Sequence, residues 1–232
     1  MSSDVDTAAV AALIANRARC AMLDALFDGG ERTAGSLAKL ARIAPSTASG
    51  HLRMLEAGGL IIVAHRGRHQ FARLASPEVA QALEALSTIA PTATSQDLRS
   101  SSRARALRQA RTCYDHLAGA LGVALTDALC RARILTGEEL ALTDGGVAQL
   151  QRFGIDLPTL RTRRRPLTRA CLDWSEKRPH LAGAIGAALC QQLLHRGWLT
   201  RMPEPRIVRL TPAGQVGLAR TFGLTHIPQP AV

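Results

Sequence analysis

Hydrophobic residues in the N-terminal third of the chain recur with the period of an α-helix, between clear turn signals. The first such pattern predicts an amphipathic helix over about 6–27, which Asp28-Gly29-Gly30 ends. Two shorter helices are predicted over about 33–40 and 45–57, with Pro45 in the first turn of the latter. The apolar positions that carry these predictions are Ala11, Ile14, Ala18, Met22, Ala25, Leu37, Leu40, Ala48, Leu52 and Leu55.

A β-hairpin is predicted after the third helix. Gly58-Gly59 ends that helix, and the apolar run 60–63 predicts a strand. The return strand includes 71–74, and the basic segment 65–69 forms the tip, with a glycine at its bend. A further helix is predicted from Pro77 to Ile89.

Two short helices at a tight turn, followed by a basic hairpin, are the parts of a winged helix-turn-helix. The second helix fits the major groove of DNA, where small hydroxyl side chains reach base edges and phosphates. The arginines of the wing suit phosphate or the minor groove. A helical hairpin packed on a ribbon, without a DNA function, is the alternative interpretation. The predicted DNA-binding residues are Pro45, Ser46, Thr47, Ser49, Gly50, His51 and Arg53 on the helix, and His65, Arg66 and Arg68 in the wing.

Taken together, four segments within residues 10–75 resemble the ArsR/SmtB family of bacterial repressors. The resemblance implies a homodimer that binds a two-fold operator in double-stranded DNA and releases it when an effector arrives. The segments are Ala15-Asn16-Arg17-Ala18-Arg19, Pro45-Ser46-Thr47-Ala48-Ser49-Gly50-His51-Leu52, Leu55-Glu56-Ala57-Gly58-Gly59-Leu60 and Arg66-Gly67-Arg68.

The chain departs from that family at its familiar metal sites. The family's arsenic and cadmium sensors carry a cysteine pair on the helix before the turn, but residues 33–38 contain no cysteine. Its zinc sensors carry carboxylate and histidine ligands on the helix after the wing, but Pro77 to Ile89 contains neither histidine nor cysteine. Gly50 stands where a longer polar side chain commonly reads the bases, so we expect modest base specificity.

A segment rich in serine, threonine and alanine separates the first 90 residues from the rest. Residues 87–102 have the composition of a domain boundary. We therefore predict a winged helix-turn-helix domain over 1–90, a linker over 91–103 and a second domain over 104–232.

The second domain contains an internal repeat. The run HLAGALGVAL from His116 returns from His180 as HLAGAIGAAL, with eight identities at an offset of 64 residues. Weaker matches extend the copies to about 111–155 and 169–224. Each copy predicts helix, short hairpin and helix, so the expected fold class is mainly α with small β-hairpin wings: a winged helix-turn-helix plus a duplicated, winged-helix-like domain. The predicted caps of the second helices are Thr143 and Thr211, with Gly154 and Gly223 at their ends.

Each copy carries a cysteine, an aspartate and a histidine in equivalent places. Cys113 and His116, three residues apart, are predicted to share a helix face. If the copies pack around a pseudo-dyad, the two cysteines and two histidines form a Cys₂His₂ pocket suited to zinc or another thiophilic metal. The two aspartates would then support the ligands or replace them. The residues are Cys113, Tyr114, Asp115 and His116 in the first copy, and Cys171, Asp173, Trp174 and His180 in the second.

Two other interpretations of these residues stay open. Tyr114 and Trp174 would line a pocket for an organic small molecule, so the effector is either a small molecule or a metal ion. Alternatively, the whole set serves packing alone, with cysteines that fill the core and aspartates that pair with arginines. A reactive thiol, its pKa lowered by nearby histidine and arginine, is a variant of the first two interpretations. The remaining cysteines, Cys20, Cys130 and Cys190, are predicted to lie in the core.

The charge suggests a polyanionic partner but does not lie where the DNA-binding motif lies. The formal net charge is +11, and 27 of the 29 basic residues are arginines. Residues 1–90 contribute +1 and residues 91–232 contribute +10. Two arginine clusters, over 103–111 and 161–169, stand out in the second part. They are predicted to contact phosphates, to form solvated faces or to pair with the two aspartates.

Composition and motifs exclude several classes of protein. Hydrophobic residues make up 47% of the chain and charged residues 20%, which is too apolar for a disordered chain. No apolar run reaches the length of a membrane span, and the acidic N-terminus and five cysteines do not fit a secreted disulfide scaffold. Walker A, GxGxxG, GxSxG and HExxH motifs are absent. A cytoplasmic protein that is not an enzyme is expected.

Together these observations predict a homodimeric bacterial transcriptional regulator, a repressor of operator DNA. An effector bound in the C-terminal domain would control its DNA affinity. A constitutive architectural DNA-binding protein without an effector is the first alternative. An enzyme that depends on the cysteines and histidines is the second.

Overall fold

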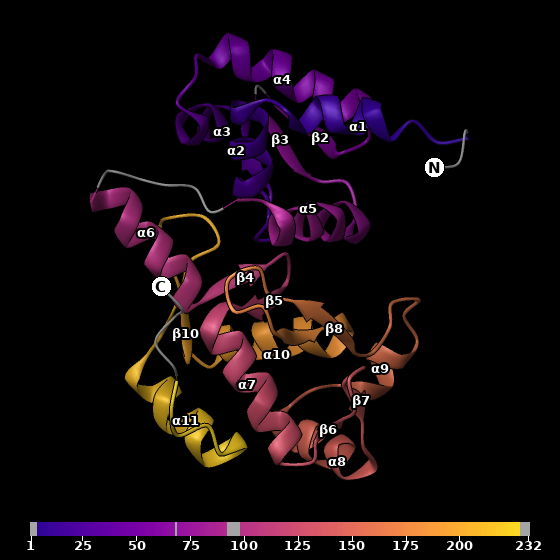
Figure 1. The fold of residues 1–232 in the computed structure, drawn as a ribbon, viewed down its shortest axis with the longest axis vertical. Coiled ribbons are helices and arrows are strands. Elements are labelled where there is room, and N and C mark those ends of the chain that lie inside the picture. Colours follow the sequence, from indigo (N-terminus) through magenta and orange to yellow (C-terminus); the bar gives the residue numbers. More distant parts are fainter. Residues whose placement is uncertain (1–3, 68, 92–97, 228–232) are drawn as a thin grey trace. The chain divides into compact units, whose positions relative to one another are not determined.

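The protein divides into two compact units, Met1–Leu83 and Glu84–Val232 (Figure 1). Each unit has its own hydrophobic core. The computed structural model describes residues 4–67, 69–91 and 98–227, with side chains for all of these except 98–101.

The region between the two predicted domains is more helical than expected. Helix α5 (Pro77–Ile89) has the predicted bounds and contains the boundary between the units, so its first part belongs to one unit and its end to the other. Helix α6 (Leu98–Gln109) begins inside the linker predicted over 91–103. Arginine, alanine, leucine and glutamine are good helix formers, and they outweigh the serines that suggested a linker. Residues 92–97 of that linker lie outside the described residues.

The first unit is a helical layer packed on a small antiparallel sheet. β3 is the central strand, with β2 on one side and β1 on the other. Helices α3 and α4 form the helix-turn-helix, and the β2–β3 hairpin forms the wing, which confirms the fold predicted for this part. The elements are α1 (Thr7–Ile14), α2 (Arg17–Ala25), β1 (Arg32–Thr33), α3 (Ala34–Ala41), α4 (Pro45–Ala57), β2 (Ile61–Arg66) and β3 (His69–Leu74).

The single helix predicted over 6–27 is wrong. Asn16 interrupts it with an extended backbone (φ −101°, ψ 125°), and its side-chain oxygen accepts hydrogen bonds from the N–H groups of Ala18 and Arg19. The asparagine therefore caps α2 and separates it from α1. Hydrophobic periodicity does not register such a competing side-chain hydrogen bond, which is why the break was missed.

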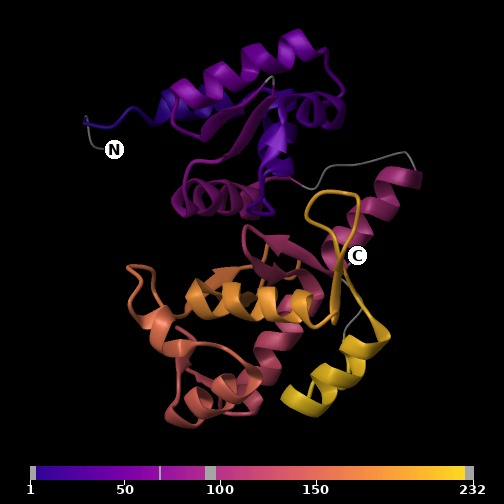
Figure 2. The ribbon, with the colours of Figure 1, turned by 180° about the vertical axis from the view of Figure 1, so that it is seen from behind.

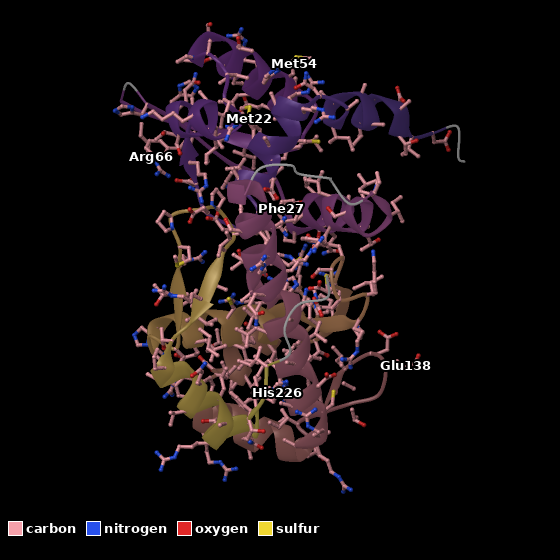
Figure 3. The ribbon with its side chains drawn as sticks, turned by 60° about the vertical axis from the view of Figure 1, so that its left-hand side comes forward. Met22, Phe27, Met54, Arg66, Glu138 and His226 are labelled. Carbon is pink, nitrogen blue, oxygen red and sulfur yellow. The ribbon has the colours of Figure 1, made fainter. Side chains whose placement is uncertain are left out.

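Apolar side chains from the helices and the sheet fill the centre of this unit. Met22 is fully buried, whereas Met54 and Arg66 lie at the surface (Figure 3). Cys20, predicted to lie in the core, is exposed. Other buried core residues are Leu23, Leu26, Leu37, Leu52, Leu55 and Ile61.

The second unit repeats one order of elements twice. Hairpin, helix, hairpin and helix follow one another in each copy, whereas the sequence predicted helix, hairpin and helix. A common origin of the two copies stays a prediction. The first copy contains β4 (Arg111–Cys113), β5 (His116–Ala118), α7 (Gly119–Arg131), β6 (Leu135–Thr136), β7 (Ala141–Leu142), α8 (Asp144–Phe153) and α9 (Leu157–Arg161); the second contains β8 (Arg169–Leu172), β9 (Pro179–Ala182), α10 (Gly183–His195), β10 (Leu199–Arg201), β11 (Val208–Leu210) and α11 (Pro212–Phe222).

The copies are interlocked at the centre of the second unit. Helices α7 and α10 cross there, as the view from behind also shows (Figure 2). α7 packs against β9 and α10 packs against β5, so each helix contacts the hairpin that precedes the other helix. Strands β5 and β9 consequently lie side by side. Buried residues of both helices, among them Leu121, Leu125, Ile185 and Leu189, belong to one continuous core.

The capping residues of the second helices are confirmed. The Thr143 and Thr211 hydroxyl oxygens accept hydrogen bonds from the N–H groups of Gly146 and Gly214, the third residues of α8 and α11. Gly154 and Gly223 end these helices in the left-handed conformation, with φ of 98° and 69°. No helix in the described part of the chain is long and apolar enough to cross a membrane.

Gly183, which opens α10, is predicted to be essential for stability. Its φ is 86°, and a Cβ there would lie 2.7 Å from the carbonyl oxygen of Leu167. Gly183→Ala should lower the free energy of unfolding by roughly 3 kcal/mol or more, because the left-handed conformation alone costs about 1–2 kcal/mol. Gly197→Ala is the matched control, since its φ is 66° but nothing lies within 4 Å. Urea denaturation measures both variants, and equal losses of stability would contradict the close packing at Gly183.

Candidate functional site

The predicted recognition helix, α4, buries one face and exposes the other. Ala48, Leu52 and Leu55 are buried against the first unit. Pro45 occupies the first helical position, and Ala44 before it provides no side-chain cap, so the helix begins without a polar side chain bound to its N-terminal N–H groups. Of the predicted DNA-binding residues on α4, Pro45, Ser46, Thr47 and Arg53 are exposed, and Ser49, Gly50 and His51 are half-buried.

The wing carries one arginine that already has partners within its own unit. Arg66 forms an ion pair with Glu31 at 2.7 Å, and its guanidinium lies over the ring of Phe71 at 5.1 Å from the ring centroid. His65 is exposed on the same strand. Arg68, also predicted to bind DNA, lies outside the described residues.

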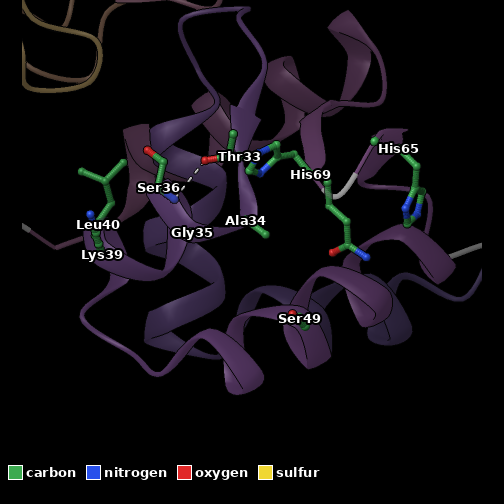
Figure 4. A pocket seen from close by; sticks show the side chains of 11 residues that line it. Thr33, Ala34, Gly35, Ser36, Lys39, Leu40, Ser49, His65 and His69 are labelled. Carbon is green, nitrogen blue, oxygen red and sulfur yellow. Dashed lines mark hydrogen bonds between the residues drawn. The ribbon is translucent and has the colours of Figure 1, made fainter.

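A cavity of about 880 Å³ opens between the recognition helix, α3 and the wing (Figure 4). Ser49 of α4 and His65 of the wing line it, so two predicted DNA-binding residues face the same hollow. β1, α3 and β3 also contribute polar side chains to the cavity that were not among the predicted DNA-binding residues. The polar side chains added there are Thr33, Ser36, Lys39, His69 and Gln70.

In the second unit, two hairpins bring the predicted cysteines and histidines together. Cys113 and His116 are directly opposite one another across β4 and β5, and Cys171 and His180 are opposite across β8 and β9. The prediction that the first pair shares a helix face is wrong. A spacing of three also fits a two-residue turn, and Tyr114, with φ of 60°, forms that turn.

These four side chains form a compact buried cluster. One ligand atom from each lies within 4.8 Å of the others, and all four residues are buried. The Nε2 atoms of His116 and His180 are 3.2 Å apart, and the two rings are stacked. In a tetrahedral zinc site the Zn–N bonds of about 2.0–2.1 Å place two nitrogens about 3.3 Å apart. The histidine pair therefore already has the spacing of two zinc ligands.

Each histidine has a carboxylate on the far side of its ring. His116 Nδ1 lies 3.3 Å from Asp115, and His180 Nδ1 lies 3.3 Å from Asp173. A carboxylate beside Nδ1 favours the proton on that nitrogen and leaves the lone pair on Nε2. At 3.2 Å the two Nε2 atoms are close enough to share a proton in a hydrogen bond or to bind a common metal ion. The hydrogen bonds of His116 with Asp115 and Cys171 raise its pKa in spite of burial.

Both aspartates are held by arginines, as one of the interpretations of the arginine clusters predicted. Arg165 binds both carboxylate oxygens of Asp115, and Arg111 lies 3.0 Å from Asp173. Burial alone would raise the pKa of Asp115, but His116 and Arg165 lower it to about 2. Burial also acts to raise the pKa of Asp173, but Arg111 and His180 hold that pKa well below its usual range.

The two cysteines differ in acidity because they share a proton. A hydrogen bond from Cys113 lowers the pKa of the Cys171 thiol far below its usual range, and His116 and His180 act in the same direction. The same hydrogen bond raises the pKa of Cys113, which burial raises further. Cys171 therefore has thiolate character, and a thiolate is the form of cysteine that binds metal.

That Tyr114 and Trp174 line a pocket for an organic molecule stays a prediction. Tyr114 forms the β4–β5 turn and is half-buried. The Trp174 ring lies against the guanidinium of Arg111, 4.3 Å from ring centroid to Cζ. Cys190 is buried in the core as predicted, whereas Cys130 is only partly buried.

Comparison with known proteins shows the family. Residues 14–64 match the family model described as "Helix-turn-helix domain". The chain is 40% identical over 215 residues to the uncharacterized HTH-type transcriptional regulator YdfF of Bacillus subtilis, covering 92% of this chain and 95% of that protein. The chain belongs to the HTH-type transcriptional regulators. The match to YdfF includes the second unit of this regulator, whereas the family model covers part of the first.

Three solved structures similar to this regulator each match part of it. NolR from Sinorhizobium fredii is 30% identical, with a TM-score of 0.34, over 37% of this chain and 85% of that one. The homodimeric winged helix-turn-helix domain of Mb0332 from Mycobacterium bovis, described as a possible ArsR-family regulator, is 29% identical, with a TM-score of 0.33, over 38% and 89%. The cadmium sensor CMTR of Mycobacterium tuberculosis is 30% identical, with a TM-score of 0.32, over 39% and 93%.

Sequence reasoning missed three charged residues next to the buried cluster of this regulator. Arg111 was taken as part of a helical arginine cluster but is fully buried on β4. Glu84 on α5 and Arg206 before β11 were not singled out, and both are buried. The sequence does contain a signal for Glu84. It lies four residues after Ala80, which is buried, and residues four apart lie on the same face of a helix, so Glu84 is on the core-facing side of this amphipathic helix.

Proposed function

We propose that this regulator is a repressor whose affinity for operator DNA falls when a thiophilic metal ion, zinc in the first place, binds to Cys113, His116, Cys171 and His180. The proposal rests chiefly on the two cross-strand cysteine–histidine pairs, which converge with their Nε2 atoms 3.2 Å apart. The four donor atoms all lie within 4.8 Å of one another, near the separations of about 3.3–3.8 Å that nitrogen and sulfur ligands have in a tetrahedral zinc site.

Charge and surroundings favour this occupant. Two thiolates neutralise a divalent cation, so the filled site places no net charge in the buried centre of the unit. The carboxylates of Asp115 and Asp173 orient the histidines from behind, as is usual for zinc-bound histidine. An organic effector is less well supported, because Trp174 lies against Arg111 and Tyr114 forms a hairpin turn.

For DNA, the proposed interface is the exposed face of α4 together with the wing. Ser46, Thr47, Ser49, Gly50, His51 and Arg53 would follow the major groove from the N-terminus of the helix, which begins at Pro45. His65, Arg66 and Arg68 would reach the flanking backbone or minor groove. Lys39, which lines the cavity beside the helix, adds a cation for phosphate. Arg66 would exchange its ion pair with Glu31 for a phosphate. A homodimer is part of the proposal, since a two-fold operator requires two such faces.

The DNA assignment is tested by the salt dependence of binding. Lys39→Ala is expected to weaken operator binding by roughly tenfold or less and to reduce the slope of log affinity against log salt by about one unit, because one phosphate contact is lost. Arg209→Ala, an exposed cation of the second unit, is the control and should leave the slope unchanged. Fluorescence anisotropy with a duplex selected by the wild-type chain from a random library measures both. An unchanged slope in Lys39→Ala would remove this residue from the interface.

A further inference from the structure

A buried row of alternating charges leads away from the Cys₂His₂ cluster. His180 Nδ1 lies 3.3 Å from Asp173, and Asp173 lies 3.0 Å from Arg111. Arg111 lies 3.5 Å from Glu84, whose second oxygen lies 3.1 Å from Arg206. All five residues are at most 7% exposed, and all belong to the second unit. We call them the charge row.

The charge row ends on the helix that continues into the DNA-binding unit. Glu84 lies on α5, which begins at Pro77 in the first unit. A second contact ties the same end of α5 to the turn that carries Asp173, since Lys177 donates a hydrogen bond to the Thr88 carbonyl oxygen at 2.9 Å. The turn is itself fixed by Asp173, which accepts hydrogen bonds from Ser175 and Glu176. The position of Asp173 therefore affects α5 by two routes.

Hydrogen bonding in the charge row is incomplete. Among the described residues, Oε1 of Glu84, Nε and Nη2 of Arg111, and Nδ1 of His180 are buried without a hydrogen-bond partner of good geometry. Glu84 Oε1, Arg111 Nη2 and His180 Nδ1 nevertheless have ion-pair partners at 3.0–3.5 Å, so opposite charges are near but not in hydrogen-bond geometry. A buried polar group without a hydrogen bond lowers the stability of the folded protein. A small rotation that forms one hydrogen bond in the row and breaks another therefore changes the free energy of the row appreciably. The pairing within the row is therefore sensitive to small changes in the orientation of these groups.

We propose that the Arg111 bridge between Asp173 and Glu84 couples occupation of the Cys₂His₂ site to α5, an inference that rests on the proposed metal-controlled DNA binding. A metal held by His180 would fix the ring and so direct its Nδ1–H at Asp173. Asp173 then shares its oxygens differently between His180 and Arg111. Arg111 in turn pairs differently with Glu84, and α5 shifts with it. Glu84, Arg111 and Arg206 are positioning residues that contact neither metal nor DNA.

Glu84→Gln tests this coupling with the full chain. The variant keeps the shape of the side chain but removes the charge that Arg111 and Arg206 share. Zinc is expected to weaken binding of the library-selected duplex roughly 5- to 150-fold in the wild type, the usual range of allosteric coupling. In Glu84→Gln this factor should fall to about twofold or less while zinc still binds at one ion per chain. Glu78→Gln, at an exposed position on the same helix, should keep the wild-type factor.

Retention of the full zinc response by folded Glu84→Gln would overturn the coupling while leaving the proposed function intact. A wild-type chain whose DNA affinity ignores zinc would overturn the proposed function, and the coupling with it. If Glu84→Gln fails to fold, hydrogen exchange in the wild type decides. Zinc is then expected to change the exchange rates of amides in 84–89 at least several-fold, and unchanged rates there would overturn the coupling.

Discussion

Replacing Cys171 by serine is expected to lower the affinity of the regulator for zinc at least about a hundredfold. Complete zinc sites contribute about 10–16 kcal/mol, and one thiolate of four donors supplies roughly a quarter of that. Cys171 is the natural choice because Cys113, His116 and His180 all lower its pKa and so favour the thiolate form that binds zinc. A hydroxyl in its place neither ionises nor binds zinc with comparable strength. Competition with a chromophoric chelator measures the affinity.

Cys130→Ser controls for the loss of a thiol as such. Cys130 is partly buried on α7, outside the four-residue cluster, so its replacement should leave zinc affinity unchanged. The double variant Cys113→Ser/Cys171→Ser should hold no zinc after purification without a chelator or affinity tag. Equal zinc content in the wild type and the double variant would contradict the site.

Thr47→Glu is expected to weaken operator binding roughly a hundredfold without harming the fold. Thr47 is exposed in the first turn of α4, where the proposal places DNA phosphates and base edges. A carboxylate there would meet the negative backbone, and like charges brought together in an interface cost several kcal/mol. In the free protein the same carboxylate lies near the positive N-terminal end of the helix dipole, which favours it by about 0.3–1 kcal/mol.

Thr47→Gln separates charge from size in this experiment. The glutamine has the same length but no charge, so its loss of DNA affinity should be several-fold at most. Thermal unfolding should show Thr47→Glu at least as stable as the wild type. If Thr47→Glu and Thr47→Gln bound DNA equally well, the N-terminal face of α4 would not be the DNA interface.

Local patterns were sufficient to predict the first unit. The apolar spacing of Leu37, Leu52 and Leu55, the proline at the start of α4 and the glycine in the wing all act within a few residues, and the elements formed there have the predicted bounds to within a few residues. The break at Asn16 was the exception. It depends on a side-chain oxygen that binds two N–H groups, an interaction that the hydrophobic pattern around it does not report.

The second unit could be predicted in its chemistry but not in its geometry. The repeat placed the cysteines and histidines in pairs, and the structure brings all four together. The pairs lie on hairpins rather than on helix faces, because Tyr114 adopts a left-handed conformation that three-residue spacing alone does not distinguish from a helical turn. Glu84 reaches Arg206 across 122 positions of sequence, and such a contact follows from the tertiary packing of α5 rather than from any local pattern.

Binding of the library-selected duplex with and without one equivalent of zinc, in the wild type and in Cys113→Ser/Cys171→Ser, tests the central claim most directly. Zinc should weaken DNA binding by the wild type roughly 5- to 150-fold. The double variant should bind DNA as tightly as the zinc-free wild type and should not respond to zinc. A wild-type affinity that is the same with and without zinc, or an equal zinc response in the double variant, would contradict control of this regulator through the Cys₂His₂ site.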